Sequence, residues 1–236
     1  MLLHSTSPDT QMLDAKRRHT RVLPMKQEPE SKPNTWFSGP EAAALFLKLY
    51  EQLKSESDRG SVIVAAALVD ESLEQLIKAR LAPSNGRDDE LFDTPYAPLS
   101  SLSAKIDFAY RAGVIRAQLK STLHLLRRLR NDFAHSSGTL DFSSHKVQSR
   151  IREIFKLNSA ILDSVFESVQ DKLQSIENEN IRATFAKATD KHSSIEKLLE
   201  LLDWRSLFDM FTAMSCAVLI RLPTQVDPIP ALETLD

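Results

Sequence analysis

Apolar residues recur through the middle of the chain at spacings of three and four, the period of an amphipathic α-helix. On this basis we predict helices at about residues 40–53, 58–81, 101–112 and 116–134. Two further helical segments are expected. One starts after Ser143 or Ser144 and runs to about 173, broken or continuous, and the other covers 180–222 with or without an interruption near His192. The first two apolar stripes consist of Leu45, Phe46, Leu49, Tyr50 and Leu53, and of Val62, Ala66, Val69, Leu73, Leu76 and Ile77. The pattern predicts an all-α protein, a bundle of about six to eight helices.

The segments without helical period divide the chain. Residues 1–35 are polar and contain prolines, so we expect a disordered arm, and its basic cluster at 16–26 is either a nucleic-acid contact or a solvated tail. Residues 36–222 are expected to form a single helical domain and residues 223–236 a C-terminal tail. Trp36 and Phe37 are expected to cover one end of the bundle. The long loop at 82–99 is predicted to be anchored in the core by Leu91, Phe92 and Tyr96.

Glycine content narrows the fold class further. The 236 residues include 5 glycines, whereas average usage would give about sixteen. They are too scattered to form the GxGxxG or GxxxxGK[ST] motifs of nucleotide-binding folds. All-β folds need frequent glycine and proline turns, and most of the 11 prolines lie outside the predicted helices. These observations exclude the Rossmann, P-loop and all-β classes.

Cysteine, histidine and hydropathy patterns argue against other kinds of site. The single Cys216 lies in an apolar run and is interpreted as a core thiol, without a disulfide framework. The six histidines show no metal-binding spacing, so we expect neither a metal nor a cofactor. No apolar run approaches the about 20 residues that a membrane span needs, and no leader is visible. We therefore expect a cytoplasmic protein that does not bind membranes.

The predicted helix at 116–134 is unusually basic. Lys120, His124, Arg127, Asn131 and His135 follow one another at spacings of four, three, four and four, which places them along one face. From this row and its neighbour Arg128 we predict a surface that binds a partner or a phosphate, formed by Lys120, His124, Arg127 and Arg128.

Arg130 falls at the edge of the buried stripe of the same predicted helix. That stripe consists of Leu119, Leu123, Leu126, Leu129 and Phe133. An isolated buried charge is costly. We therefore expect Arg130 either to pair with Asp70 or Glu71 or to serve a function.

The end of this helix, Arg130-Asn131-Asp132-Phe133-Ala134-His135, resembles the R-[polar]-x3-H signature of HEPN domains. Many members of that family are helical, dimeric, metal-independent endoribonucleases. The resemblance implies that Arg130 would hold the scissile phosphate, His135 would act as general acid and base, and Asn131 would orient them. In an ideal helix Arg130 and His135 point about 140° apart, so they converge only if the last turn distorts or a dimer mate supplies one of them. The structural alternative is that His135 stabilises the helix C-terminus.

A longer resemblance covers about residues 40–160. The sequences at 67–77 (ALVDESLEQLI), 91–92 (LF) and 98–115 (PLSSLSAKIDFAYRAGVI) are similar to the mannitol operon repressor (MtlR) family. The resemblance implies an all-helical regulator that lacks a recognised DNA-binding motif. From the residues themselves, Lys105 is expected to pair with Asp70 or Glu74 of the neighbouring helix, a structural role.

Two functional hypotheses follow. The first is a non-enzymatic negative regulator of transcription, resembling the MtlR family, that binds a regulatory protein or a nucleic acid without a helix-turn-helix and forms a homodimer. The second is a HEPN-type metal-independent endoribonuclease, acting as a toxin or in defence, in which Arg130, Asn131 and His135 form the catalytic site at a dimer interface.

Overall fold

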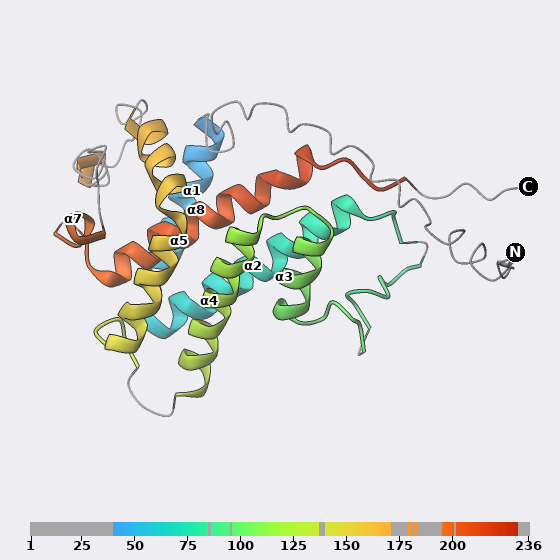
Figure 1. The fold of residues 1–236 in the computed structure, drawn as a ribbon, viewed down its shortest axis with the longest axis horizontal. Helices are drawn as coiled ribbons and strands as arrows, with labels where there is room; N and C mark the ends of the chain where they lie inside the picture. Colours follow the sequence, from blue (N-terminus) through green and yellow to red (C-terminus); the bar gives the residue numbers. More distant parts are fainter. Residues whose placement is uncertain are drawn as a thin grey trace, which may run out of the picture. The chain divides into compact units, whose positions relative to one another are not determined.

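A computed structural model describes residues 40–84, 86–94, 96–136, 140–170, 179–180, 182–183, 195–200 and 202–230. Every regular element in this part of the chain is helical, which confirms the predicted fold class (Figure 1). The helices are α1 (Pro40–Lys54), α2 (Asp58–Arg80), α3 (Leu102–Arg111), α4 (Ala117–His135), α5 (His145–Gln170), α7 (Ile195–Leu199), α8 (Trp204–Arg221) and the short 3-10 helix η4 (Leu222–Gln225). The predicted basic arm, with Trp36 and Phe37 after it, lies outside the described residues.

Local capping chemistry sets several helix ends. The hydroxyl of Ser57 accepts a hydrogen bond from the backbone N–H of Gly60 (3.1 Å), so the N-cap of α2 lies one residue before Asp58. The Ser101 hydroxyl caps α3 in the same way through Ala104 (3.2 Å). Gly113 follows the end of α3 with φ of 73°, a conformation that glycine adopts without strain.

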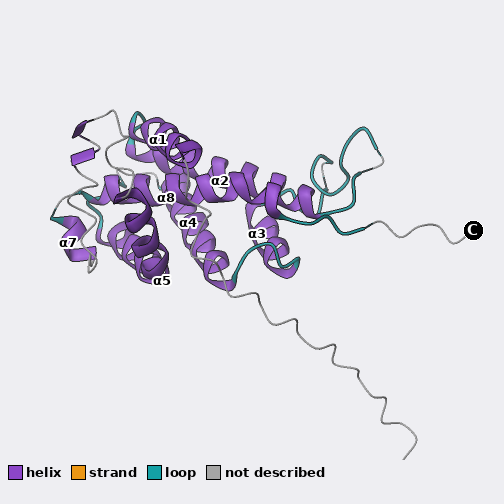
Figure 2. Ribbon diagram, turned by 90° about the horizontal axis from the view of Figure 1, so that it is seen from above, coloured by secondary structure: helices purple, strands orange, loops and turns teal. Residues whose placement is uncertain are grey.

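The core lies where α8 and α2 cross the other helices. α8 packs against α1 and α2, while α4 packs against α2, α3 and α5. The apolar stripes predicted for α1 and α2 are buried apart from Leu45, which is half-buried, and Leu53, Val62 and Leu73 are fully inaccessible to solvent. In Figure 2 the described part consists of helices joined by loops. For α1 and α2 the helical period therefore predicted both the elements and the faces that they bury, whereas the segment expected at 180–222 is interrupted between α7, which ends at Leu199, and α8, which begins at Trp204.

α8 is the most apolar of these helices. Among the described residues, the segment Trp204–Gln225 is long and apolar enough to cross a membrane by length and composition. However, 61 % of its most apolar 18-residue stretch is buried inside the protein. Leu207, Ala213 and Leu219 of α8 are at most 1 % exposed. The apolar character of α8 is thus explained by its place in the core, because a helix that is surrounded by others is apolar on most sides.

The loop between α2 and α3 differs from the prediction at one anchor. Phe92 is buried (7 % exposed) and Leu91 packs against the core, as expected. Tyr96 is 96 % exposed, so its predicted anchoring role is wrong. Leu99, whose N–H donates to the carbonyl of Leu91 (2.9 Å), is buried instead. The core beside α2 is filled by Phe92 and Leu99, and the turn between them directs Tyr96 to solvent.

The segment after α8 binds back to α2. The N–H of Ile229 donates to the carbonyl of Arg80 (2.7 Å), and the Arg80 guanidinium binds the carbonyl of Asp227. Val226 packs against the core. Residues 223–230, which begin the predicted tail, are therefore attached to the C-terminal end of α2.

Candidate partner-binding surface at the end of helix α4

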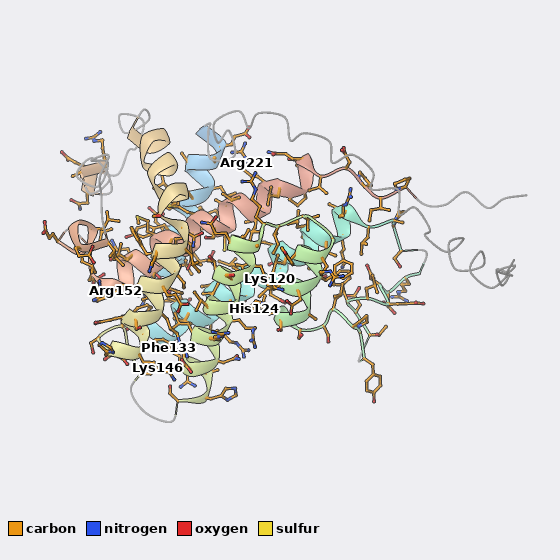
Figure 3. All side chains as sticks on the ribbon, in the orientation of Figure 1. Lys120, His124, Phe133, Lys146, Arg152 and Arg221 are labelled. Atoms are coloured by element: carbon orange, nitrogen blue, oxygen red, sulfur yellow. The ribbon has the colours of Figure 1, made fainter. Side chains whose placement is uncertain are left out.

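The first half of α4 uses its polar residues internally. Lys120 Nζ lies 2.8 Å from Asp107 Oδ1 of α3, and His124 Nε2 lies 3.3 Å from the same oxygen. Figure 3 shows Lys120 and His124 next to each other on α4. The hydrogen bond from Lys120 holds the pKa of Asp107 below its usual value. Two members of the predicted partner-binding row are thus already paired with α3.

The last turns of α4 are held by α2 and α5. Asp132 lies 2.9 Å from Lys146 Nζ of α5 and forms a second ion pair with Arg150. Arg59, in the first turn of α2, donates to the carbonyl of Ala134 (2.8 Å). This bond satisfies one of the carbonyls that a helix C-terminus leaves without an intrahelical partner. The end of α4 is therefore fixed in place, and the charge of Asp132 is neutralised within the protein.

Four further cationic or titratable side chains lie in the same turns, and within the described part of the chain none of them contacts an acid. Arg128, Arg130 and His135 are exposed, and Arg127 is half-buried. The Nε of Arg127 is buried without a hydrogen-bond partner. We call Arg127, Arg128, Arg130 and His135 the basic end. The basic end contains Arg127 and His135 of the predicted row. Lys120 and His124 of that row do not belong to it, because they contact α3.

Arg130 does not pair with Asp70 or Glu71, so the pairing alternative is wrong. It is exposed, and its Nη1 donates to Oδ1 of the adjacent Asn131 (3.2 Å). Arg130 is not part of the buried face of α4, which consists of Thr122, Leu123, Leu125, Leu126, Leu129 and Phe133. A side chain at the edge of such a stripe extends to water, as long cationic side chains do.

The buried cation is Lys105. Its Nζ lies 2.8 Å from Asp70 and 2.9 Å from Glu74 of α2, although the residue is only 4 % exposed. Burial lowers the pKa of Lys105, but the hydrogen bonds that its ammonium donates to the two carboxylates outweigh this effect and leave the pKa raised. Glu74 also pairs with Lys78 (2.7 Å). The structure thus brings Lys105 and Asp70 together in a cluster that joins α3 to α2.

The residues of the HEPN-like motif share one helix end without converging. Residues 117–135 form one uninterrupted α-helix, closed by a hydrogen bond from the N–H of Ser136 to the carbonyl of Asp132 (2.9 Å). Arg130 and His135, five residues apart, therefore point about 140° away from each other. A single chain does not direct both side chains at one phosphate. The arrangement that would do so uses residues of two chains.

Sequence reasoning missed a buried polar network at the start of α8. Asp209 is 1 % exposed and accepts hydrogen bonds from Ser61 (2.5 Å) and from Arg205 Nε (2.8 Å). Arg205 also binds Asp58 (2.8 Å) and the carbonyls of Leu53 (2.8 Å) and Glu56 (3.0 Å). Burial raises the pKa of Asp209, against the opposing effect of these hydrogen bonds. The sequence does contain a signal for this network, because Arg205 and Asp209 lie four residues apart in a mostly apolar helix.

An open cavity of about 570 Å³ lies between the end of α2 and the following loop. Its lining includes Lys78, Leu81, Ser84, Asp89 and Glu90. Lys78 is already paired with Glu74 and lies 4.8 Å from the ring centre of Phe92. Within the described residues, no group of three or more histidine, cysteine or acidic side chains is arranged to hold a metal ion.

No family model matches the sequence, and no curated protein matches it significantly. A similar solved structure is the X-ray structure of the MtlR–HPr complex from Escherichia coli. The matched chain is 18 % identical to this one. The match covers 75 % of this chain and 98 % of the other, with a TM-score of 0.47.

Proposed function

We propose that this protein is a non-enzymatic regulator that acts by binding an acidic protein surface through the basic end. The observation that carries the proposal is the separation of charges along α4. Lys120 in its first half forms an ion pair with Asp107, which also contacts His124, whereas Arg128 and Arg130 at its end are exposed. Exposed arginines bind carboxylates strongly because the guanidinium can donate two parallel hydrogen bonds. The resemblance of residues 67–115 to a family of regulators points in the same direction.

The extent of the basic end favours a protein partner over a nucleic acid. Proteins that follow a nucleic-acid backbone present a stripe or a face of cations. The basic end occupies the last turns of one helix, and neighbouring Lys146 and Arg150 are paired with Asp132. The whole chain has a net charge of −2. A small cationic site matches a local cluster of carboxylates better than it matches a long polyanion.

Fluorescence anisotropy with a labelled oligoglutamate peptide tests this proposal. We expect the double variant Arg128→Glu/Arg130→Glu to weaken binding by at least about tenfold, because two favourable charge contacts become repulsive. The control variant Lys48→Glu/Lys156→Glu makes the same change of net charge at exposed positions of α1 and α5 and should bind like the wild type. Equal loss in both variants would contradict the proposal. If a labelled RNA or DNA duplex bound more tightly than the peptide, the partner would be a nucleic acid and not a protein.

The endoribonuclease is a second candidate, favoured by the exposure of its motif. Arg130 and His135 are both accessible at the end of α4, and Arg130 is hydrogen-bonded to Asn131. An exposed histidine can accept a proton from a ribose 2′-hydroxyl, and an arginine can neutralise the phosphate. Because the two side chains diverge within one chain, this candidate requires a dimer.

RNA cleavage in the presence of EDTA distinguishes the two candidates. An endoribonuclease of this kind gives products with cyclic-phosphate ends, and His135→Ala abolishes cleavage while circular dichroism shows an unchanged helical fold. The regulator proposal predicts no cleavage by either protein. Cleavage by the wild type but not by His135→Ala would therefore contradict the hypothesis that the protein is a non-enzymatic regulator.

A further inference from the structure

The loop after α2 carries the opposite charge to the basic end. Within residues 86–96, Asp88, Asp89, Glu90 and Asp93 accompany a single base, Arg87. Asp88 and Glu90 are exposed, and no ion pair involves either of them among the described residues. Asp89 and Asp93 shape the loop instead, since their carboxylates accept hydrogen bonds from the N–H groups of Leu91 (3.0 Å) and Asp89 (3.1 Å). We call residues 86–94 together with Tyr96 the acidic loop.

The acidic loop and the basic end lie at opposite ends of α2. Arg59 in the first turn of α2 binds the carbonyl of Ala134 at the basic end. Lys78 near the other end lies 4.8 Å from the ring centre of Phe92 in the acidic loop. The 23 residues of α2 separate the two by about 33 Å at 1.5 Å per residue. In the view of Figure 1, the loop and the end of α4 both extend below α2.

We propose that a second copy of this chain docks antiparallel to the first, so that the acidic loop of each chain covers the basic end of the other. A two-fold axis across the middle of α2 creates this contact twice and closes the assembly as a dimer. The reverse alignment places arginines against arginines and aspartates against aspartates, and like charges repel. Charge complementarity therefore favours a second copy of the chain as the partner, and it favours the antiparallel orientation of that copy.

Tyr96 supports this choice of occupant. It is 96 % exposed and lies within the acidic loop. An aromatic ring beside carboxylates is suited to an arginine-rich surface, because the guanidinium stacks on the ring face while it binds the acid. Within one chain a related contact is made by a lysine: Lys120 Nζ lies 4.8 Å from the ring centre of Tyr110 while it pairs with Asp107. The dimer gives Tyr96 a cationic surface that the described part of its own chain does not place beside it.

Sedimentation equilibrium of the full chain at low and high NaCl measures this association. We expect a dimer at low salt that dissociates as salt rises, since exposed charges are screened. The basic-swap variant, Arg128→Glu/Arg130→Glu, and the acid-swap variant, Asp88→Lys/Glu90→Lys, should each be monomeric. Their mixture should form a 1:1 dimer, because each swapped surface now meets its complement. One chain that carries both swaps should again dimerise with itself.

Two controls separate this interface from others. Lys48→Glu/Lys156→Glu changes the net charge as the basic swap does and should leave the dimer intact. Tyr96→Ala should weaken dimerisation by roughly tenfold, because a modest stacking contact is lost twice. A wild-type chain that stays monomeric at low salt would overturn the proposal. So would a dimer that both swaps leave unchanged, or swapped chains that fail to associate on mixing although circular dichroism shows that both are folded.

Discussion

At the scale of single residues, the cluster around Lys105 shows how a buried charge is tolerated. Lys105 contacts two carboxylates, Asp70 and Glu74, and Glu74 also contacts Lys78. Burial raises the pKa of Glu74, but the hydrogen bonds from the two lysines have the larger combined effect and lower it. Because the folded-state pKa of Glu74 lies below the unfolded value of about 4.5, its ionisation stabilises the fold at neutral pH.

We predict that this stabilisation is lost as the pH falls through the unfolded pKa toward the lower folded one. Urea unfolding of the wild type should show a decreasing free energy of unfolding below about pH 4.5. Glu74→Gln should be about 1 kcal/mol less stable at pH 7 and should lose less stability on acidification. Glu71→Gln, an exposed position on the same helix, should keep the acid dependence of the wild type. Equal pH profiles for all three proteins would contradict this account.

Cys216 makes a second prediction at this scale. It lies in α8 with no exposed surface, and burial raises the pKa of its thiol to about 12. The thiolate is the reactive form of cysteine. We expect Ellman's reagent at pH 8 to modify Cys216 only after the protein unfolds in urea. Rapid modification of the native protein would show that α8 is not the core helix described above.

At the scale of elements, Arg205 connects three helices. It lies in the first turn of α8, and its guanidinium binds Asp209, Asp58 at the start of α2 and the carbonyls that end α1. Its side chain is 16 % exposed, so these bonds form in a partly water-excluded environment where unpaired partners are costly. The network explains why the turn between α1 and α2 lies against the N-terminus of α8.

Replacing Arg205 by methionine should therefore cost about 2–4 kcal/mol of stability, because buried Asp209 loses its cation. Arg152 of α5 provides the matched control. It forms an ion pair of 3.0 Å with Glu196, but both side chains are at least half exposed. Arg152→Met should cost less than about 1 kcal/mol in the same urea titration. A similar loss in both variants would show that the burial of the Arg205 network does not matter.

At the scale of the whole molecule, the proposed dimer and the proposed partner require the same basic end. Self-association must then compete with partner binding. The acid-swap variant keeps the basic end intact but removes the acidic loop that covers it in the dimer. At protein concentrations where the wild type is dimeric, we expect this variant to bind the oligoglutamate peptide several-fold more tightly. The same affinity for both proteins would show that the dimer does not cover the basic end.

The two proposals fail separately in these measurements. A basic-swap and acid-swap mixture that dimerises supports the interface even if neither chain binds the peptide. Peptide binding that depends on Arg128 and Arg130 supports the partner-binding site even if the wild type is monomeric at every salt concentration. Sedimentation and anisotropy thus report on different contacts of one surface.

The sequence by itself determined the helices and the apolar faces of α1 and α2, because helical period, capping serines and Gly113 act within a few residues of each other. The sequence also identified four candidate functional residues near the end of α4, namely Arg127, Arg128, Arg130 and His135. Only the tertiary structure decided which cations remain available. Lys120 is paired with an acid of α3 that also contacts His124, and Lys146 and Arg150 are paired with an acid of α4. Those pairings depend on how the helices pack against each other, which the period of one helix does not specify.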